Sequence, residues 1–135
     1  MGPVVLDTSV VIAVTSPSDP HHRDAAQEFA SLRKAGREFR LSTISIAELH
    51  SFKGPGRKGR IETANRFVDT LGASAVVDVD RAIAERAGSV RKSRPALHLA
   101  DALIKATADH IGGELLTADR RLARLEGVKL LGAKP

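Results

Sequence analysis

Four acidic residues lie where short apolar runs end or where helical patterns begin. Asp7 follows the first apolar run of the chain, and Asp119 comes soon after a later one. Glu48 and Asp101 lie in segments with helical patterns. Carboxylates that are brought together repel one another, so a cluster of four requires a cation. Carboxylate oxygens without sulfur ligands select magnesium or manganese, and we expect one or two such ions.

Other kinds of chemistry find little support in the sequence. The chain has no cysteine, which excludes disulfides, thiolate zinc sites and cysteine nucleophiles and favours a reducing cytoplasm. It also lacks the HExxH, P-loop and GxGxxG patterns of zinc proteases and nucleotide-binding folds. The five histidines are expected in surface or packing roles. The acids therefore carry the candidate site.

Composition bounds both the size of the fold and the kind of partner. With 135 residues, 42% of them hydrophobic and 27% charged, the chain is expected to form one folded domain over residues 1–135. The apolar stretch 4–14 is interrupted by Asp7 and too short to span a bilayer, so we interpret it as a buried strand and expect no membrane association. The net charge of +5 favours a polyanionic partner.

The apolar patterns alternate between short strands and amphipathic helices. This alternation predicts an α/β fold with a mainly parallel, about five-stranded sheet covered by helices. The glycine-rich and basic segment 53–60 is expected to be an exposed loop. Strands are predicted at 4–6, 39–43, 75–79, 115–117 and 128–131, the last at the sheet edge, and helices at 23–35, from Ser45 onward, and at 61–71, 81–92, 97–111 and 121–125.

The predicted topology brings the four acids to one edge. In a parallel sheet, ligands bind beyond the carboxyl ends of the strands. Asp7 and Asp119 follow strands there, and Glu48 is predicted in the first turn of the helix after the second strand. Asp101 reaches this edge only if its helix turns back tightly through Gly112-Gly113 into the fourth strand.

Each acid also has a purely structural alternative. Any one of these alternatives is plausible alone, but four together at one sheet edge are less so. The alternatives are local contacts: a turn at Asp7, a capping box of Glu48 with Ser45, an N-cap at Asp119 and an ion pair of Asp101 with Lys105.

The acids stand in four motifs that occur in a set order. The motifs are Val5-Leu6-Asp7-Thr8-Ser9, Ser45-Ile46-Ala47-Glu48-Leu49, Leu99-Ala100-Asp101-Ala102-Leu103-Ile104 and Leu116-Thr117-Ala118-Asp119. With these motifs the chain resembles the PIN-domain family of metal-dependent nucleases, especially the VapC-type toxins of VapBC toxin–antitoxin pairs. The similarity covers nearly the whole chain.

The resemblance implies a three-layer α/β/α sandwich and an endoribonuclease that uses Mg²⁺ or Mn²⁺. It also implies a homodimer and inhibition by a cognate, VapB-like antitoxin. Asp7, Asp101 and Asp119 match metal-ligand positions, and Glu48 either binds a second ion or assists proton removal through a water. Thr117 matches a hydroxyl position that orients a ligand or water, and Thr8 is expected to support the acids beside it.

Basic residues around the acids are candidates for contacts with RNA phosphates. The absence of Trp and Tyr argues against a base-stacking platform, so recognition by RNA shape is expected. The alternatives are a PIN nuclease that processes RNA outside a toxin pair and a non-catalytic binding module. A phosphoacceptor domain fits the acid pattern poorly. The candidate substrate contacts are Lys53, Arg57, Lys58, Arg60, Arg120 and Arg121.

Overall fold

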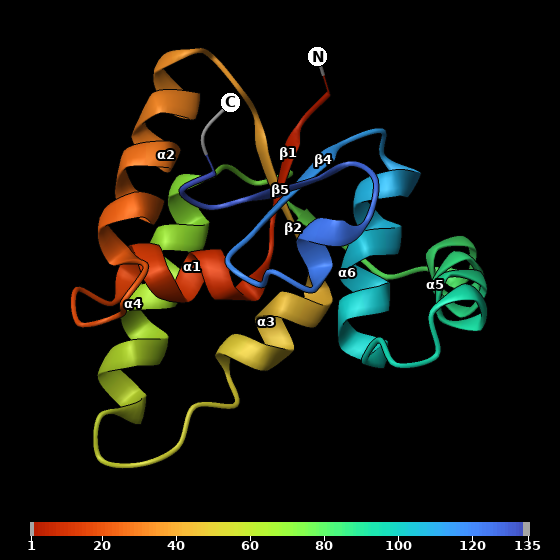
Figure 1. The fold of residues 1–135 in the computed structure, drawn as a ribbon. Helices are drawn as coiled ribbons and strands as arrows, with labels where there is room; N and C mark the ends of the chain where they lie inside the picture. The colour runs from red at the N-terminus through yellow and green to blue at the C-terminus, as the bar shows by residue number, and fades with distance from the viewer. Residues whose placement is uncertain (1, 134–135) are drawn as a thin grey trace.

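A computed structural model describes residues 2–133. Five parallel strands form one sheet in the order β3-β2-β1-β4-β5 (Figure 1). No helix of residues 2–133 combines the length and the apolar character needed to cross a membrane. The strands are β1 (Val4–Leu6), β2 (Phe39–Ser42), β3 (Val76–Val77), β4 (Glu114–Thr117) and β5 (Val128–Leu130). The helices are α1 (Thr8–Thr15), α2 (His22–Lys34), α3 (Thr43–Leu49), α4 (Arg57–Thr70), α5 (Arg81–Ser93), α6 (Leu99–His110) and the 3-10 turn η1 (Leu122–Arg124).

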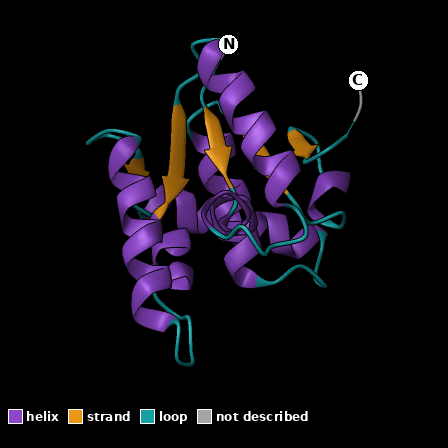
Figure 2. Cartoon of the chain, turned by 90° about the vertical axis from the view of Figure 1, so that its left-hand side faces the viewer, coloured by secondary structure: helices purple, strands orange, loops and turns teal. Residues whose placement is uncertain are grey.

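Helices cover both faces of the sheet, as the alternation along β1 dictates. Val4 and Leu6 pack into the cluster formed with α1, α2 and α4, whereas Val5 packs with Ile104 of α6 on the opposite face. Helix α5 packs on α6 through Ile83. Figures 1 and 2 show the strands enclosed between these two groups of helices. The structure confirms the α/β/α sandwich and the position of β5 at the sheet edge.

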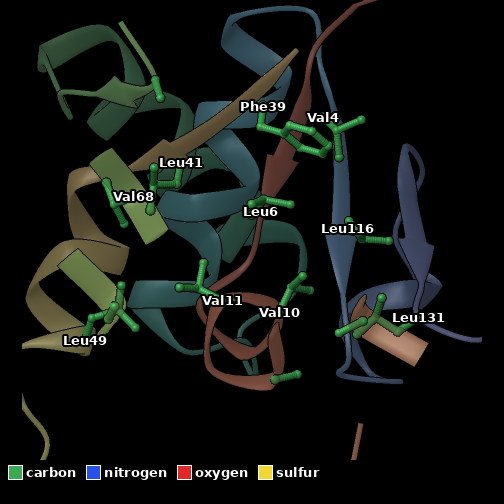
Figure 3. Packing of buried hydrophobic residues seen from close by; sticks show 14 residues of the cluster. Val4, Leu6, Val10, Val11, Phe39, Leu41, Leu49, Val68, Leu116 and Leu131 are labelled. Atoms are coloured by element: carbon green, nitrogen blue, oxygen red, sulfur yellow. The ribbon is translucent and has the colours of Figure 1, made fainter. Parts of the chain in front are cut away.

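The larger cluster joins the three central strands to the first helix. Leu6, Leu41 and Leu116 come from β1, β2 and β4, and none is more than 1% exposed (Figure 3). Val10 and Val11 of α1 pack beneath them and are fully buried. Burying such a side chain stabilises the fold by roughly 1.5–3 kcal/mol relative to exposure. This packing fixes the position of the chain that follows Asp7.

The helix α1 corrects the interpretation of 4–14 as a single strand. The strand ends at Leu6, Asp7 is extended (φ −65°, ψ 152°), and Thr8–Thr15 is helical. Its β-branched residues have a local preference for strands. Packing overrides this preference because one helical turn places Val10 and Val11 against the sheet.

The prediction of an exposed loop at 53–60 is wrong for its second half. Helix α4 begins at Arg57 after Gly56, so Gly59 and Arg60 are helical. The Arg60 guanidinium stacks 3.8 Å above the centre of the Phe52 ring. This cation–π contact across the preceding turn favours the early helix start, whereas the sequence pattern emphasised the glycines.

A tight turn connects α6 to β4. Gly112 has φ +68°, and the Gly113 N–H donates to the Ala108 carbonyl at 2.8 Å. A side chain at Gly113 would place its Cβ only 2.8 Å from the backbone oxygen of Pro3. Because α6 turns back directly into β4, the first turn of α6 lies at the carboxyl edge of the sheet.

Candidate active site

Asp7 is a buried carboxylate at the end of the central strand. Its residue is 5% exposed, and its N–H extends the β1–β4 ladder by donating to the Leu116 carbonyl at 2.9 Å. Its Oδ2 accepts hydrogen bonds from Ser9 Oγ and Thr117 Oγ1, both at 2.7 Å. Within residues 2–133 the side chain caps no backbone N–H of α1. The hydroxyls therefore orient Asp7, and the alternative of a local backbone turn finds no support.

Thr117 connects Asp7 to Asp119. Its side chain is fully buried at the end of β4, where its hydroxyl donates to Asp7 and accepts from the Asp119 N–H at 3.0 Å. Ser9 makes a parallel connection, because its Oγ also accepts from the Ala118 N–H at 3.1 Å. Ser9 was not predicted to be part of the site. The sequence signal that could have indicated its role is a hydroxyl two residues after an acid that ends a strand.

Glu48 lies in the last turn of α3, and its predicted place in the first turn is wrong. The helix is capped by Ser42, whose Oγ accepts from the Ile44 N–H at 3.0 Å. Because this cap is the last residue of β2, the helix begins before Ser45, which therefore is not its N-cap. Thr8 Oγ1 donates to Glu48 Oε1 at 2.6 Å and lies 2.9 Å from Ser45 Oγ. Thr8 directly follows Asp7, so its hydrogen bond connects Glu48 of α3 to the start of α1 beside Asp7.

Asp101 lies in the first turn of α6 and is partly buried. Burial raises the pKa of Asp101, and the charges of Asp7, Asp119 and Glu48 raise it further, while His98 lowers it. The suggested ion pair with Lys105 is absent from the described residues, since Lys105 pairs with Asp109. All three other acids thus act on Asp101 as parts of one electrostatic cluster.

Asp119 has the opposite shift. Partial burial raises the pKa of Asp119, but hydrogen bonds and charge from Arg121 outweigh this effect and hold it below its ordinary range. The Arg121 N–H donates to Oδ1 at 2.8 Å, and its Nη2 lies 3.4 Å from Oδ2. The first of these bonds closes a turn at Asp119, so the proposed N-cap gives way to a local turn before η1. Arg121 thus lowers the pKa of Asp119, whereas burial and the three other acids raise that of Asp101.

A cavity of about 240 Å³ joins Asp101 and Asp119. His98 also lines it and was not expected there, whereas His50 and His22 form other contacts, with Asn65 Oδ1 and the Ala13 carbonyl. The cavity has three cationic side chains: Arg94, Arg121 and Arg124.

The PIN domain family model matches residues 4–128. The chain belongs to the PIN domain family. No curated protein matches its sequence significantly.

Several solved structures share this PIN domain's fold. A toxin–antitoxin complex from Klebsiella pneumoniae is 27% identical, with 93% of this chain and 95% of that chain covered and a TM-score of 0.71. VapBC2 from Rickettsia felis, bound to a fragment of its promoter DNA, is 17% identical with a TM-score of 0.76, and 94% and 96% of the two chains are covered. VapC20 from Mycobacterium tuberculosis, described as a sarcin-ricin loop cleaving toxin, is 18% identical with a TM-score of 0.72, covering 94% and 98%. The chain thus shares its fold with VapC-type toxins.

The donor set of the PIN domain fits a hard divalent cation. Its four carboxylates interact without cysteine or paired histidines, and the repulsion that raises the pKa of Asp101 is what a cation would relieve. Among residues 2–133, no three Asp, Glu or His side chains are already arranged as a complete metal-binding group. Closing the site around a cation therefore needs side-chain adjustment.

Replacing Asp101 by asparagine is expected to raise the Tm of the metal-free protein by about 2 °C. A raised pKa means that ionised Asp101 destabilises the fold at pH values above that pKa, and asparagine removes this charge. The gain is therefore expected at neutral pH and lost below the ordinary Asp value of 3.8. Thermal melting in EDTA measures it. Added Mn²⁺ should stabilise the wild type more than the variant, and an equal shift would contradict a metal role for Asp101.

The six predicted basic contacts lie in different surroundings. Arg121 lines the carboxylate cavity, whereas Arg60 lines a separate cavity with Phe52 beside the end of α1. Arg57 donates to the His50 carbonyl at 3.1 Å. The other three predicted residues, Lys53, Lys58 and Arg120, line neither of these two cavities.

Proposed function

We propose that this PIN domain is an endoribonuclease that depends on Mg²⁺ or Mn²⁺ and acts as the toxin of a type II toxin–antitoxin pair. The observation that carries the proposal is the Asp7 carboxylate, buried at the central strand end and oriented by two hydroxyls. A carboxylate held in this way beside three others is suited to a metal ligand. Its likeness to a toxin described as cleaving the sarcin-ricin loop supports RNA as the substrate.

Asp7, Asp101 and Asp119 would hold the metal. A bound ion supplies Lewis-acid charge that neutralises the scissile phosphate and lowers the pKa of water. Thr117 keeps Asp7 and the backbone of Asp119 in register through its two hydrogen bonds. These contacts place the ligands of two adjacent strands before an ion binds, which reduces the cost of organising the site.

Glu48 is the residue suited to a second ion or to proton transfer. Thr8 holds Oε1, and the other carboxylate oxygen has no hydrogen bond to residues 2–133. That oxygen is available to accept a proton through a water or to bind a second ion. Each role uses the orientation that Thr8 imposes.

RNA cleavage in the presence and absence of metal tests this proposal. The purified chain should cleave labelled RNA with Mg²⁺ or Mn²⁺, lose activity in EDTA and regain it when metal is restored. Undiminished cleavage in excess EDTA would exclude the metal-dependent mechanism.

The toxin role adds a cognate VapB-like antitoxin, a homodimer and a cytoplasmic location to the proposal. Structural similarity to toxin–antitoxin complexes supports the antitoxin partner. A short DNA-binding protein encoded next to this chain should bind it and inhibit cleavage when the two are co-expressed. A chain that cleaves RNA but has no inhibitory neighbour would instead be a PIN nuclease outside a toxin pair. Analytical ultracentrifugation measures the mass of the purified chain in solution, which should be that of a homodimer.

Replacing Thr117 by valine is expected to lower cleavage by roughly 10–100-fold, because it removes the hydroxyl between Asp7 and Asp119. Thr107→Val is the matched control, since Thr107 is also fully buried but bonds only the Leu103 carbonyl. Steady-state kinetics on labelled RNA measures both. Equal activity of the two variants would show that Thr117 does not organise the site.

A further inference from the structure

A second cavity adjoins the carboxylate cavity along α5 and α6. It measures about 650 Å³, compared with about 240 Å³ for the carboxylate cavity. Arg94 and Leu125 line both cavities, so the two are neighbours with a shared wall. The second cavity therefore borders the cavity that contains Asp101 and Asp119.

Arg94 carries an uncommitted positive charge at this boundary. It is exposed at the C-cap of α5, and within residues 2–133 its guanidinium forms no hydrogen bond or ion pair. Arg91 donates to the Leu97 carbonyl at 3.0 Å, and Arg121 pairs with Asp119. Arg86 and Arg124 are also unpaired among the described residues, but each lines one of the two cavities, whereas Arg94 lines both. A positive charge at a helix C-terminus interacts favourably with the helix dipole, and this interaction alone would account for an arginine here. Its place between two cavities gives Arg94 access to a ligand that extends through both.

The walls of the second cavity suit a nucleotide. Val90 and Leu125 offer apolar surface, and the Lys105 side chain, 9% exposed, is held in the wall by its ion pair with Asp109. The pair adds polar groups without net charge. A volume of about 650 Å³ is within the range of small-molecule sites.

We propose that an RNA strand continues from the carboxylate cavity across Arg94 into the second cavity. Arg94 binds the phosphate next to the scissile one, and the second cavity takes the adjoining nucleotide. This inference rests on the proposed nuclease function and assigns the path of its substrate. Guanidinium groups bind phosphates in a bidentate manner, whereas the acids repel a neighbouring phosphate, so this position needs a cation.

The basic segment predicted from the sequence is less suited to this path. Arg60 is engaged with the Phe52 ring, and the cavity that it lines contains none of the four acids. Arg57 is engaged with the His50 carbonyl. Arg94 instead shares a cavity with Asp101 and Asp119.

Binding of a fluorescein-labelled, single-stranded RNA of mixed sequence tests the proposal. The full chain carries Asp7→Asn so that the probe stays intact, and fluorescence anisotropy is measured over a range of salt concentrations. Arg94→Gln should weaken binding roughly fivefold and reduce the salt slope by about 0.7, as expected for one lost phosphate contact on a single strand. Arg81→Gln removes the same charge from the exposed start of α5 and should leave the slope unchanged.

A second variant tests the cavity without changing charge. Ser89→Phe adds bulk at its wall and should weaken binding roughly threefold with the salt slope unaltered, because shape is disturbed and phosphate contacts are kept. Ser31→Phe, at an exposed position of α2, is the control. Equal affinity of the two serine variants would exclude the second cavity, and equal slopes for Arg94→Gln and Arg81→Gln would exclude the phosphate contact.

The outcomes separate this inference from the proposed function. If the wild type cleaves no RNA but Arg94→Gln weakens binding as expected, the nuclease proposal fails and the binding path stands. If the wild type cleaves RNA with metal and Arg94→Gln binds as tightly as the parent, the path is wrong and the nuclease stands.

Discussion

Replacing Asp7 by asparagine is expected to lower RNA cleavage by at least about a thousandfold, or about 4 kcal/mol in the barrier, while the fold is retained. Both hydroxyls that hold Asp7 donate to the same oxygen, Oδ2. An amide carbonyl oxygen can accept both bonds, so the variant keeps the local geometry and loses the negative charge that a metal requires. Cleavage of labelled RNA at saturating Mn²⁺ measures the loss.

Asp69→Asn provides the matched control for this experiment. Asp69 lies exposed on α4, so the same chemical change there should leave both cleavage and melting temperature near those of the wild type. The Asp7 variant should melt no earlier than the wild type in EDTA, since it removes one of the charges that act on Asp101. Full cleavage by this folded variant would refute the proposed role of Asp7.

Replacing Gly113 by alanine is expected to destabilise the fold by about 2–3 kcal/mol. The added Cβ would lie 2.8 Å from the Pro3 carbonyl oxygen and 3.3 Å from Val5 Cγ2, and the first of these contacts is with backbone. Relief requires β4 to move away from β1, and this movement would separate Thr117 from Asp7. Chemical denaturation measures the loss of stability.

Gly88→Ala is the control for the Gly113 variant. Gly88 is inside α5, and a Cβ there meets no atom within 4 Å. Alanine should therefore stabilise the helix by roughly 0.5–1 kcal/mol through its higher helix propensity. If both variants changed stability in the same direction, the close approach of Gly113 to Pro3 would not determine the packing of these strands.

Short-range patterns were sufficient for most of the sheet. The run Val4 to Leu6 predicted β1 because three consecutive buried apolar residues suit a strand covered on both faces. The helix at 81–92 was predicted almost to its ends because apolar residues recur along one face. In the structure Asp80 also caps it by accepting a hydrogen bond from the Ile83 N–H. In both segments local preference and packing favour the same structure.

Prediction failed where packing opposed a local preference. Val10 and Val11 favour a strand locally, yet they form part of α1 because a helix buries both against the sheet. The start of α3 was misplaced because Ser42 and Ser45 are both capable N-caps, and the end of β2 decides between them. Neither result could be obtained from a single segment.

The sequence by itself determined the parallel α/β fold, the identity of the four acids and their order along the chain. Alternating apolar periods and acids at strand ends are properties of neighbouring residues, so they can be read locally. The tertiary structure decided how the acids are held: Thr117 and Ser9 orient Asp7, Thr8 holds Glu48, and Arg94 joins two cavities. Three of these relations span residues far apart in the chain, and only the packing of sheet and helices sets their distances.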